Sequence, residues 1–177
     1  MRKIANEELG RLNVAAFKQV EKTPIVIVLD NVRSANNVGS AFRTADAFAL
    51  SGVYLCGITA KPPHRDINKT ALGATESVTW QHESDTLKAI ETLKQEGYTI
   101  VAVEQAEGAI KLQTYQFEGK TALVFGHEVT GVSEEVMKQV DACIEIPQFG
   151  TKHSINISVS VGVVVWDLFK QWKWLQK

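Results

Sequence analysis

The chain has 177 residues, 45% of them hydrophobic and 22% charged, with a formal net charge of −1. This composition is typical of a globular domain with one substantial core, and the charge argues against a strongly basic nucleic-acid binder. There is no basic-then-apolar leader and no apolar run of about 18 residues free of polar groups, so neither secretion nor membrane insertion is predicted. We therefore expect one domain, 1–177, in the cytoplasm.

The positive charge is concentrated in the first part of the chain. Residues 1–70 hold ten Lys/Arg and six Asp/Glu, whereas residues 71–177 hold nine and fourteen. Such asymmetry can mark a surface that faces a polyanion, although a solvated helix face also explains any single lysine. Within an N-terminal extension, 1–22, we predict one amphipathic helix from about Asn6 to Val20.

The first predicted strand is a continuous apolar run from Ile25 to Leu29, which indicates burial on both faces of a sheet. A closely packing helix follows, beginning at Asn36 or Asn37 and ending near Gly52. The later pattern alternates strands with helices: strand 53–58, a brief extended piece 77–80, helix 85–97, strand 98–104, strand 121–126, a helix capped by Ser133, and strand 142–146. The sequence thus predicts an α/β fold, a mainly parallel sheet with helices on both faces.

The last segment alternates apolar residues like a strand but runs from Ser154 to Lys173 without a turn signal. Strands usually end within about 4–8 residues, so length favours a buried helix, with Ser154 as its possible N-cap.

Three polar loops follow predicted strands: DNVRSANN, GHEVTGVS and PQFGTKHS. In an open parallel sheet, ligands bind beyond the carboxyl ends of the strands, so these loops are the main functional signal. Familiar alternatives fail in detail. Val132 stands where a P-loop needs Lys, and Gly131 stands where a zinc-protease motif needs its second His. The histidines and cysteines show no metal-ligand spacing, so we predict no metal site, and Cys56 and Cys143 are expected to be reduced core residues.

Together the stretches NNVGSAFRTADAF, LVFGHEVTGVSEEV and IPQFGTKHSINISVSVGVVVW resemble the three ordered motifs of the SpoU/TrmH family of RNA ribose 2′-O-methyltransferases, part of the SPOUT class. The resemblance covers about Pro24 to Leu168. It implies a C-terminal trefoil knot, S-adenosylmethionine as methyl donor, an obligate homodimer and an RNA substrate, tRNA favoured over rRNA. Ala49 departs from the family, which usually has Gly there.

The resemblance also implies site residues. Candidate catalytic residues are Arg43, Asn37, Glu128, Ser154 and Asn156, and candidate cofactor-binding residues are Val103, Gly126, Ile146 and Ile155. We expect Arg43 to anchor a phosphate rather than act as the base, because a guanidinium has a pKa above about 12. Glu128 is expected to fix loop geometry or to pair with Arg43. The candidate RNA-binding residues are Arg11, Lys18, Arg33, Arg65 and Lys69.

Two other functions stay open on the sequence. A catalytically silent RNA-binding relative would keep the surface but not the chemistry, and the intact Arg43, Glu128, Ser154 and Asn156 argue against it. A nucleotide-binding domain with a non-RNA substrate predicts no RNA-dependent methyl uptake.

Overall fold

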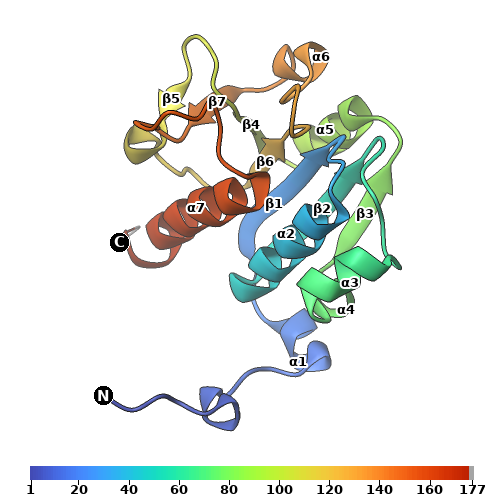
Figure 1. The fold of residues 1–177 in the computed structure, drawn as a ribbon, viewed down its shortest axis with the longest axis vertical. Helices are drawn as coiled ribbons and strands as arrows, with labels where there is room; N and C mark the ends of the chain where they lie inside the picture. Colours follow the sequence, from blue (N-terminus) through green and yellow to red (C-terminus); the bar gives the residue numbers. More distant parts are fainter. Residues whose placement is uncertain (176–177) are drawn as a thin grey trace.

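A seven-stranded parallel sheet forms the centre of the computed structural model, which describes residues 1–175 (Figure 1). The strand order is β3-β2-β1-β6-β4-β7-β5, and every neighbouring pair is parallel. The strands are β1 (Thr23–Asp30), β2 (Leu50–Cys56), β3 (Trp80–Glu83), β4 (Thr99–Val103), β5 (Ile110–Lys111), β6 (Thr121–Phe125) and β7 (Ala142–Glu145). The predicted parallel sheet is confirmed, and β5 lies in a link where no strand was predicted.

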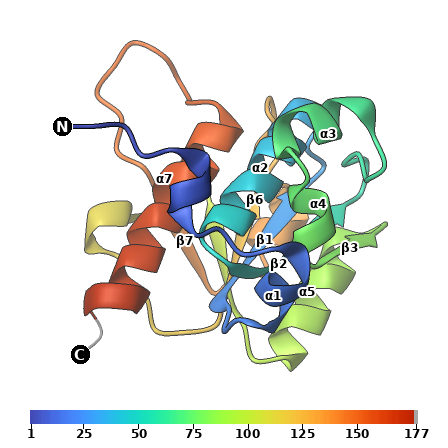
Figure 2. The same cartoon turned by 90° about the horizontal axis from the view of Figure 1, so that it is seen from below.

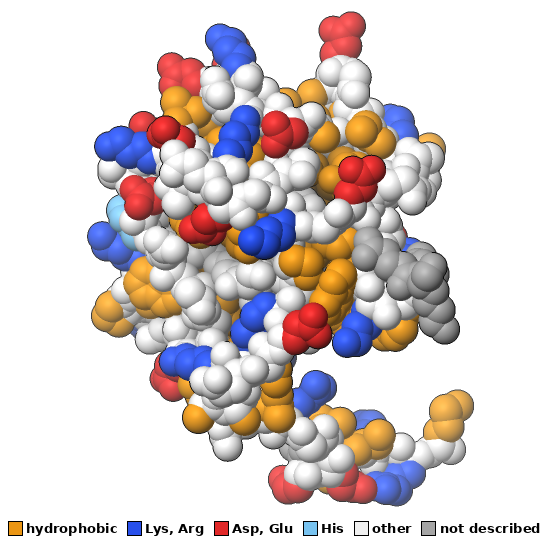
Figure 3. Space-filling view, turned by 180° about the vertical axis from the view of Figure 1, so that it is seen from behind, with side chains coloured by type: hydrophobic (Ala, Val, Ile, Leu, Met, Phe, Trp, Pro, Cys, Tyr) orange, Lys and Arg blue, Asp and Glu red, His pale blue; other side chains and the backbone are white. Residues whose placement is uncertain are grey.

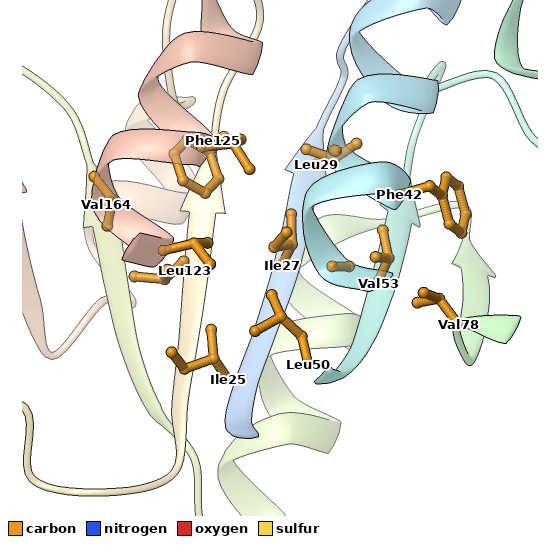
Figure 4. Packing of buried hydrophobic residues seen from close by; sticks show 14 of the residues in the cluster. Ile25, Ile27, Leu29, Phe42, Leu50, Val53, Val78, Leu123, Phe125 and Val164 are labelled. Atoms are coloured by element: carbon orange, nitrogen blue, oxygen red, sulfur yellow. The ribbon is translucent and has the colours of Figure 1, made fainter. Parts of the chain in front are cut away.

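Helices cover both faces of the sheet, as predicted. One face carries α2 (Ala35–Ala47), α3 (Arg65–Ala71), α4 (Ala74–Ser77) and α7 (Ile157–Lys170), and the other carries α5 (Thr86–Gln95) and α6 (Glu134–Met137). Side chains of β1 contribute to both cores. Ile27 belongs to the same core as Phe42 of α2 (Figure 4). Val28 belongs to the core on the other face, with Ile90 of α5. This two-sided burial explains why β1 is a continuous apolar run.

Helices α2 and α7 lie side by side on the same face (Figure 1 and Figure 2). Both begin at the edge of the sheet where the parallel strands end. They bring the first and third sequence motifs together, although more than 100 residues separate Arg43 from Ile157 in the printed sequence.

The single N-terminal helix predicted over Asn6–Val20 is wrong. The segment forms two short pieces, the 3-10 helix η1 (Asn6–Leu9) and α1 (Val14–Gln19). Gly10 follows η1 with φ +59°, a left-handed conformation that stops the first piece, and Asn13 caps the second by accepting from the Ala16 amide at 2.9 Å. Figure 3 shows the part of this segment before α1 extending away from the rest of the molecule, whereas α1 packs against α4, with Phe17 buried.

The predicted C-terminal helix is confirmed, but its start is not Ser154. Asn156 is the N-cap, because its Oδ1 accepts from the Ser158 backbone amide at 2.8 Å. After α7 the chain continues as the π-helical turn η3 (Gln171–Leu175); the remaining helical turn, η2 (Leu112–Thr114), follows β5. The 154–156 segment is thereby left free to form a loop wall instead of a helical turn.

Other boundaries differ by a few residues. Helix α2 starts at Ala35 with Ser34 as its cap, not at Asn36 or Asn37, and the extended piece expected over 77–80 is shifted to β3 because α4 occupies its beginning. Ala49 has φ +47°, which accounts for Gly being usual there in the family that the motifs resemble. Burial raises the pKa of the Cys56 thiol to about 12, and that of Cys143 also upward, so neither is a poised nucleophile.

Candidate functional site

A cavity of about 390 Å³, the loop cavity, lies at the carboxyl ends of β4, β6 and β7. All four predicted cofactor-binding residues line it, namely Val103, Gly126, Ile146 and Ile155. Three of the five predicted catalytic residues also line it, namely Glu128, Ser154 and Asn156. Its size lies within the roughly 300–1,000 Å³ of small-molecule sites, and its walls mix apolar side chains with exposed backbone and polar groups.

Gly126 allows the loop after β6 to fold tightly over the strand end. A Cβ at this position would lie 2.1 Å from the carbonyl carbon of Gly131 and 2.1 Å from the amide nitrogen of Val132. The loop is closed by two backbone hydrogen bonds between His127 and Gly131, at 3.0 and 2.9 Å. Gly126 is therefore required for the loop's own packing, whatever the cavity holds.

Glu128 ties this loop to the start of α2. Its carboxylate accepts from the backbone amides of Arg33 and Ser34, both at 2.9 Å, and from the Asn37 side-chain amide at 3.1 Å. Burial alone would raise the pKa of Glu128, but these hydrogen bonds outweigh it and lower the pKa below its ordinary value. Of the two predicted roles, fixing loop geometry is the one the contacts support, since no ion pair joins Glu128 to Arg43 within residues 1–175.

Two further carboxylates hold the same loop, and both were missed from the sequence. Glu104 accepts from the Val132 amide at 3.0 Å, and the buried Asp30 accepts from the Ser133 amide at 3.2 Å and the Thr86 hydroxyl at 2.6 Å. The available signal was their position, because each acidic residue directly follows an apolar strand run. A carboxylate there can bind the backbone amides of neighbouring loops.

The loop that precedes α7 closes the other side of the cavity. The Oδ1 of Asn156 accepts the hydrogen bond that caps α7. The same loop is held against the loop after β4, because the Gln105 side-chain amide donates to the carbonyl of His153 at 2.6 Å. Ser154 and Ile155 lie between these two anchors, exposed to solvent and facing the cavity that they line. The cavity wall is thus fixed at both ends.

Arg43 does not line the loop cavity. It lies two turns along α2 and lines a second hollow of about 520 Å³, the basic cavity, with Ser40, Thr44, Ala47, Phe48, Lys69, Thr70 and Leu72. Asn37 is likewise absent from the loop-cavity lining and acts on Glu128 instead. The structure therefore gathers seven of the nine predicted catalytic and cofactor residues at one cavity and leaves two on α2.

The predicted RNA-binding side chains are all exposed, on several elements. Arg11 and Lys18 belong to the N-terminal segment, Arg33 follows β1, and Arg65 and Lys69 lie at the two ends of α3. Of these, only Lys69 lines either of the two cavities described.

Within residues 1–175, no group of three or more His, Cys, Asp and Glu side chains is placed to hold a metal ion. None of the helices in that range is both long and apolar enough to cross a bilayer.

Comparison with known proteins assigns this chain to a family. Residues 24–166 match the model of the SpoU rRNA Methylase family, which spans the sheet, both cavities and most of α7. This range starts just after the N-terminal segment.

Among curated relatives, a tRNA (guanosine(18)-2′-O)-methyltransferase of Borreliella burgdorferi is 32% identical over 81% of this chain and 65% of its own length. The enzyme of the same description from Thermus thermophilus is 30% identical over 93% of this chain and 84% of its own. A solved structure described as an AdoMet-bound rRNA methyltransferase from Sinorhizobium meliloti has a TM-score of 0.80 and 24% identity, over 89% of this chain and 60% of that one. The chain thus spans about two thirds of the Borreliella relative and most of the Thermus one.

Proposed function

Because the chain belongs to the SpoU rRNA Methylase family, we propose that it is an S-adenosylmethionine-dependent RNA methyltransferase that methylates a ribose 2′-hydroxyl. The observation that carries the proposal is the loop cavity, where residues of the second and third motifs meet at the carboxyl ends of three parallel strands. Transfer RNA is the favoured substrate, since two similar enzymes are named for guanosine 18 of tRNA. Ribosomal RNA is the alternative.

The loop cavity fits the proposed cofactor. Val103, Ile146 and Ile155 give apolar walls that exclude water, while the backbone at Gly126 offers hydrogen-bonding groups at a strand end. The similar Sinorhizobium structure is described as AdoMet bound, which supports the same choice. When bound, S-adenosylmethionine supplies an electrophilic methyl group on a sulfonium sulfur.

The remaining chemistry is to position a ribose hydroxyl and to remove its proton. We assign Ser154 to the substrate side of the loop cavity, because its side chain is exposed there and lies between two fixed anchors. Asn37, Glu128 and Asn156 act as positioning residues, since their polar atoms bind the loops and the α7 cap. The side chain of Arg43 makes no hydrogen bond or ion pair within the described part of the chain and is suited to anchor an RNA phosphate.

We further propose that the protein is a homodimer through α7. Val159, Val163 and Trp166 are 52%, 39% and 47% exposed and recur on one side of a helix that otherwise packs in the core. An apolar stripe of this kind marks an interaction surface, and a second copy is the partner that the family resemblance implies. Sedimentation should show a dimer that Val163→Asp converts to monomer, whereas Ile58→Asp, at an exposed site outside the stripe, leaves it dimeric.

Two finer parts of the proposal concern the chain path and the compartment. We propose that the C-terminal segment is threaded as a trefoil knot, supported by the likeness to a solved methyltransferase at TM-score 0.80. We also propose that the enzyme acts in the cytoplasm, where its RNA substrates are. Residues 1–22 are proposed as a helical extension of a single domain.

Methyl uptake tests the proposed function. The protein incubated with S-adenosylmethionine labelled on the methyl group should label bulk tRNA more than purified rRNA. Label in rRNA alone would contradict tRNA as the substrate and support rRNA instead. Absence of label in either RNA, from a protein that binds the cofactor, would contradict the enzyme assignment and favour a catalytically silent relative.

A further inference from the structure

All the charged side chains that line the basic cavity are positive. Its lining residues include Arg43 and Lys69 and no aspartate or glutamate. The acidic residues of the two helices that form it do not neutralise it: Asp46 accepts a hydrogen bond from Ser77, and Asp66 does not line the cavity. In a chain of net charge −1, a hollow with two cations and no carboxylate favours an anion.

Neither cation is engaged elsewhere. Within residues 1–175, the ion pairs and side-chain hydrogen bonds involve other cationic residues, and both Arg43 and Lys69 are exposed. Lysine and arginine without protein partners remain available to a ligand, and a guanidinium beside an ammonium suits a phosphate group.

The backbone positions from which the two cationic side chains extend are fixed by close packing of α2 on α3 (Figure 1). A Cβ on Gly39 would lie 2.1 Å from the Thr70 Oγ1 and 2.3 Å from the Ile67 carbonyl oxygen, so only glycine allows this approach. The Thr70 hydroxyl also donates to the Asn36 carbonyl at 3.0 Å, joining the two helices. The two helices that carry Arg43 and Lys69 therefore form a rigid platform, so binding need not order the backbone.

The remaining walls suit more than a lone phosphate ion. Phe48 and Leu72 form apolar surface, Leu72 being 66% exposed, and the cavity measures about 520 Å³. This combination of two cations with an apolar wall matches a phosphate that carries a sugar and base.

We propose that the basic cavity is an RNA subsite in which Lys69 and Arg43 together hold one backbone phosphate of the substrate, next to a sugar or base on Phe48 and Leu72. The inference rests on the proposed function and places Lys69, one of the candidate RNA-binding residues, at the same phosphate as Arg43. Because α2 begins at the loop cavity and carries Arg43 two turns later, the same helix would relate the held phosphate to the site of methyl transfer.

Salt-dependent binding of bulk tRNA tests the subsite without any catalytic step. The dissociation constant is measured by filter binding over a range of salt concentrations for the wild type, Lys69→Ala, Lys69→Arg and Lys88→Ala. Lys88 is an exposed lysine on α5, on the opposite face of the sheet, and is the matched control. Losing one phosphate contact should reduce the slope of log affinity against log salt by about 0.7–0.9. Lys69→Ala should show that loss and weaker binding, while Lys69→Arg and Lys88→Ala keep the wild-type slope.

A second variant adds the opposite charge. Leu72 has φ +50°, a left-handed conformation that aspartate adopts more readily than most residues, so Leu72→Asp should fold and weaken tRNA binding further than Lys69→Ala. Affinity for S-adenosylmethionine, measured by calorimetry, should stay unchanged in all variants.

The outcomes separate the two proposals. If Lys69→Ala and Leu72→Asp bind tRNA with the wild-type slope and affinity, the subsite is wrong even when the enzyme methylates RNA. If both variants show the reduced salt slope and weaker binding, but the wild type methylates no RNA, the subsite stands and the proposed activity fails. A wild type that binds neither tRNA nor rRNA overturns the subsite.

Discussion

The loop cavity is lined by Glu104 and Glu128 and by no lysine or arginine, whereas the basic cavity is lined by Arg43 and Lys69 and by no carboxylate, within the part of the chain that the structure describes. The carboxylates of the loop cavity are occupied with backbone amides, so they shape the wall. The side chains of Arg43 and Lys69 in the basic cavity bind no backbone amide or carbonyl and form no ion pair within residues 1–175. The polar side chains of one region build a pocket for a small molecule, and those of the other remain available to a polyanion.

Removing the guanidinium from the basic cavity should have the largest effect. We expect Arg43→Ala to lower kcat/KM for RNA methylation by about 10²-fold or more, because misplacing a reacting hydroxyl or losing charge stabilisation costs that much. Arg43 is exposed, so the fold and cofactor affinity should persist. Arg43→Lys keeps the charge without the bidentate fork and should fall between the two. Near-normal turnover in Arg43→Ala would remove the functional distinction between the cavities.

A charge placed in the loop cavity should instead weaken cofactor binding. Ile155→Asp puts a carboxylate on an apolar part of the wall, and the affinity for S-adenosylmethionine should fall at least about tenfold, measured by calorimetry. Phe149→Asp is the matched control, since Phe149 is 98% exposed on the same loop and does not line the cavity. Equal affinities for the two variants would argue that the cofactor binds elsewhere. Gly126 variants are unsuitable here, because any side chain would collide with the loop backbone.

The smallest effect is expected from Glu128, and it depends on pH. Its hydrogen bonds lower the pKa in the folded state, so the stabilisation is fully present above the unfolded pKa near 4.5 and is lost as the pH falls through the folded pKa. Glu128→Gln should therefore reduce the free energy of unfolding by about 1 kcal/mol at pH 7, since the group is partly solvated. Urea unfolding should show the difference shrink below pH of about 4.5. Glu91→Gln, at an exposed position on α5, should show neither change.

Much of the fold could be predicted because burial leaves a pattern in the sequence. The run from Ile25 to Leu29 is apolar throughout since β1 lies between two helical layers, and the length of the last segment correctly indicated α7. Local signals were weaker guides to boundaries. The apolar residues of 6–20 fit a helix only loosely, and Gly10 in a left-handed conformation divides the segment.

The part of the candidate site that could be predicted is the part whose residues belong to the recognised motifs. The loop-cavity residues come from the second and third motifs and from the end of β4, and they meet because parallel strands end at one edge. The sequence did not indicate that Asp30 and Glu104 would bind loop amides, because that pairing joins residues far apart in the chain. It also did not separate Arg43 from the cofactor residues, which requires knowing how far α2 extends from the sheet edge.

The central claim is that this protein methylates a ribose 2′-oxygen, and the chemical position of the transferred methyl group tests it most directly. RNA methylated by the wild-type protein is digested to nucleosides, and the products are identified by mass spectrometry. We predict a 2′-O-methylated nucleoside that forms in the wild-type reaction and is strongly reduced in the Arg43→Ala reaction over the same time. A methyl group found on a base would contradict the proposed chemistry.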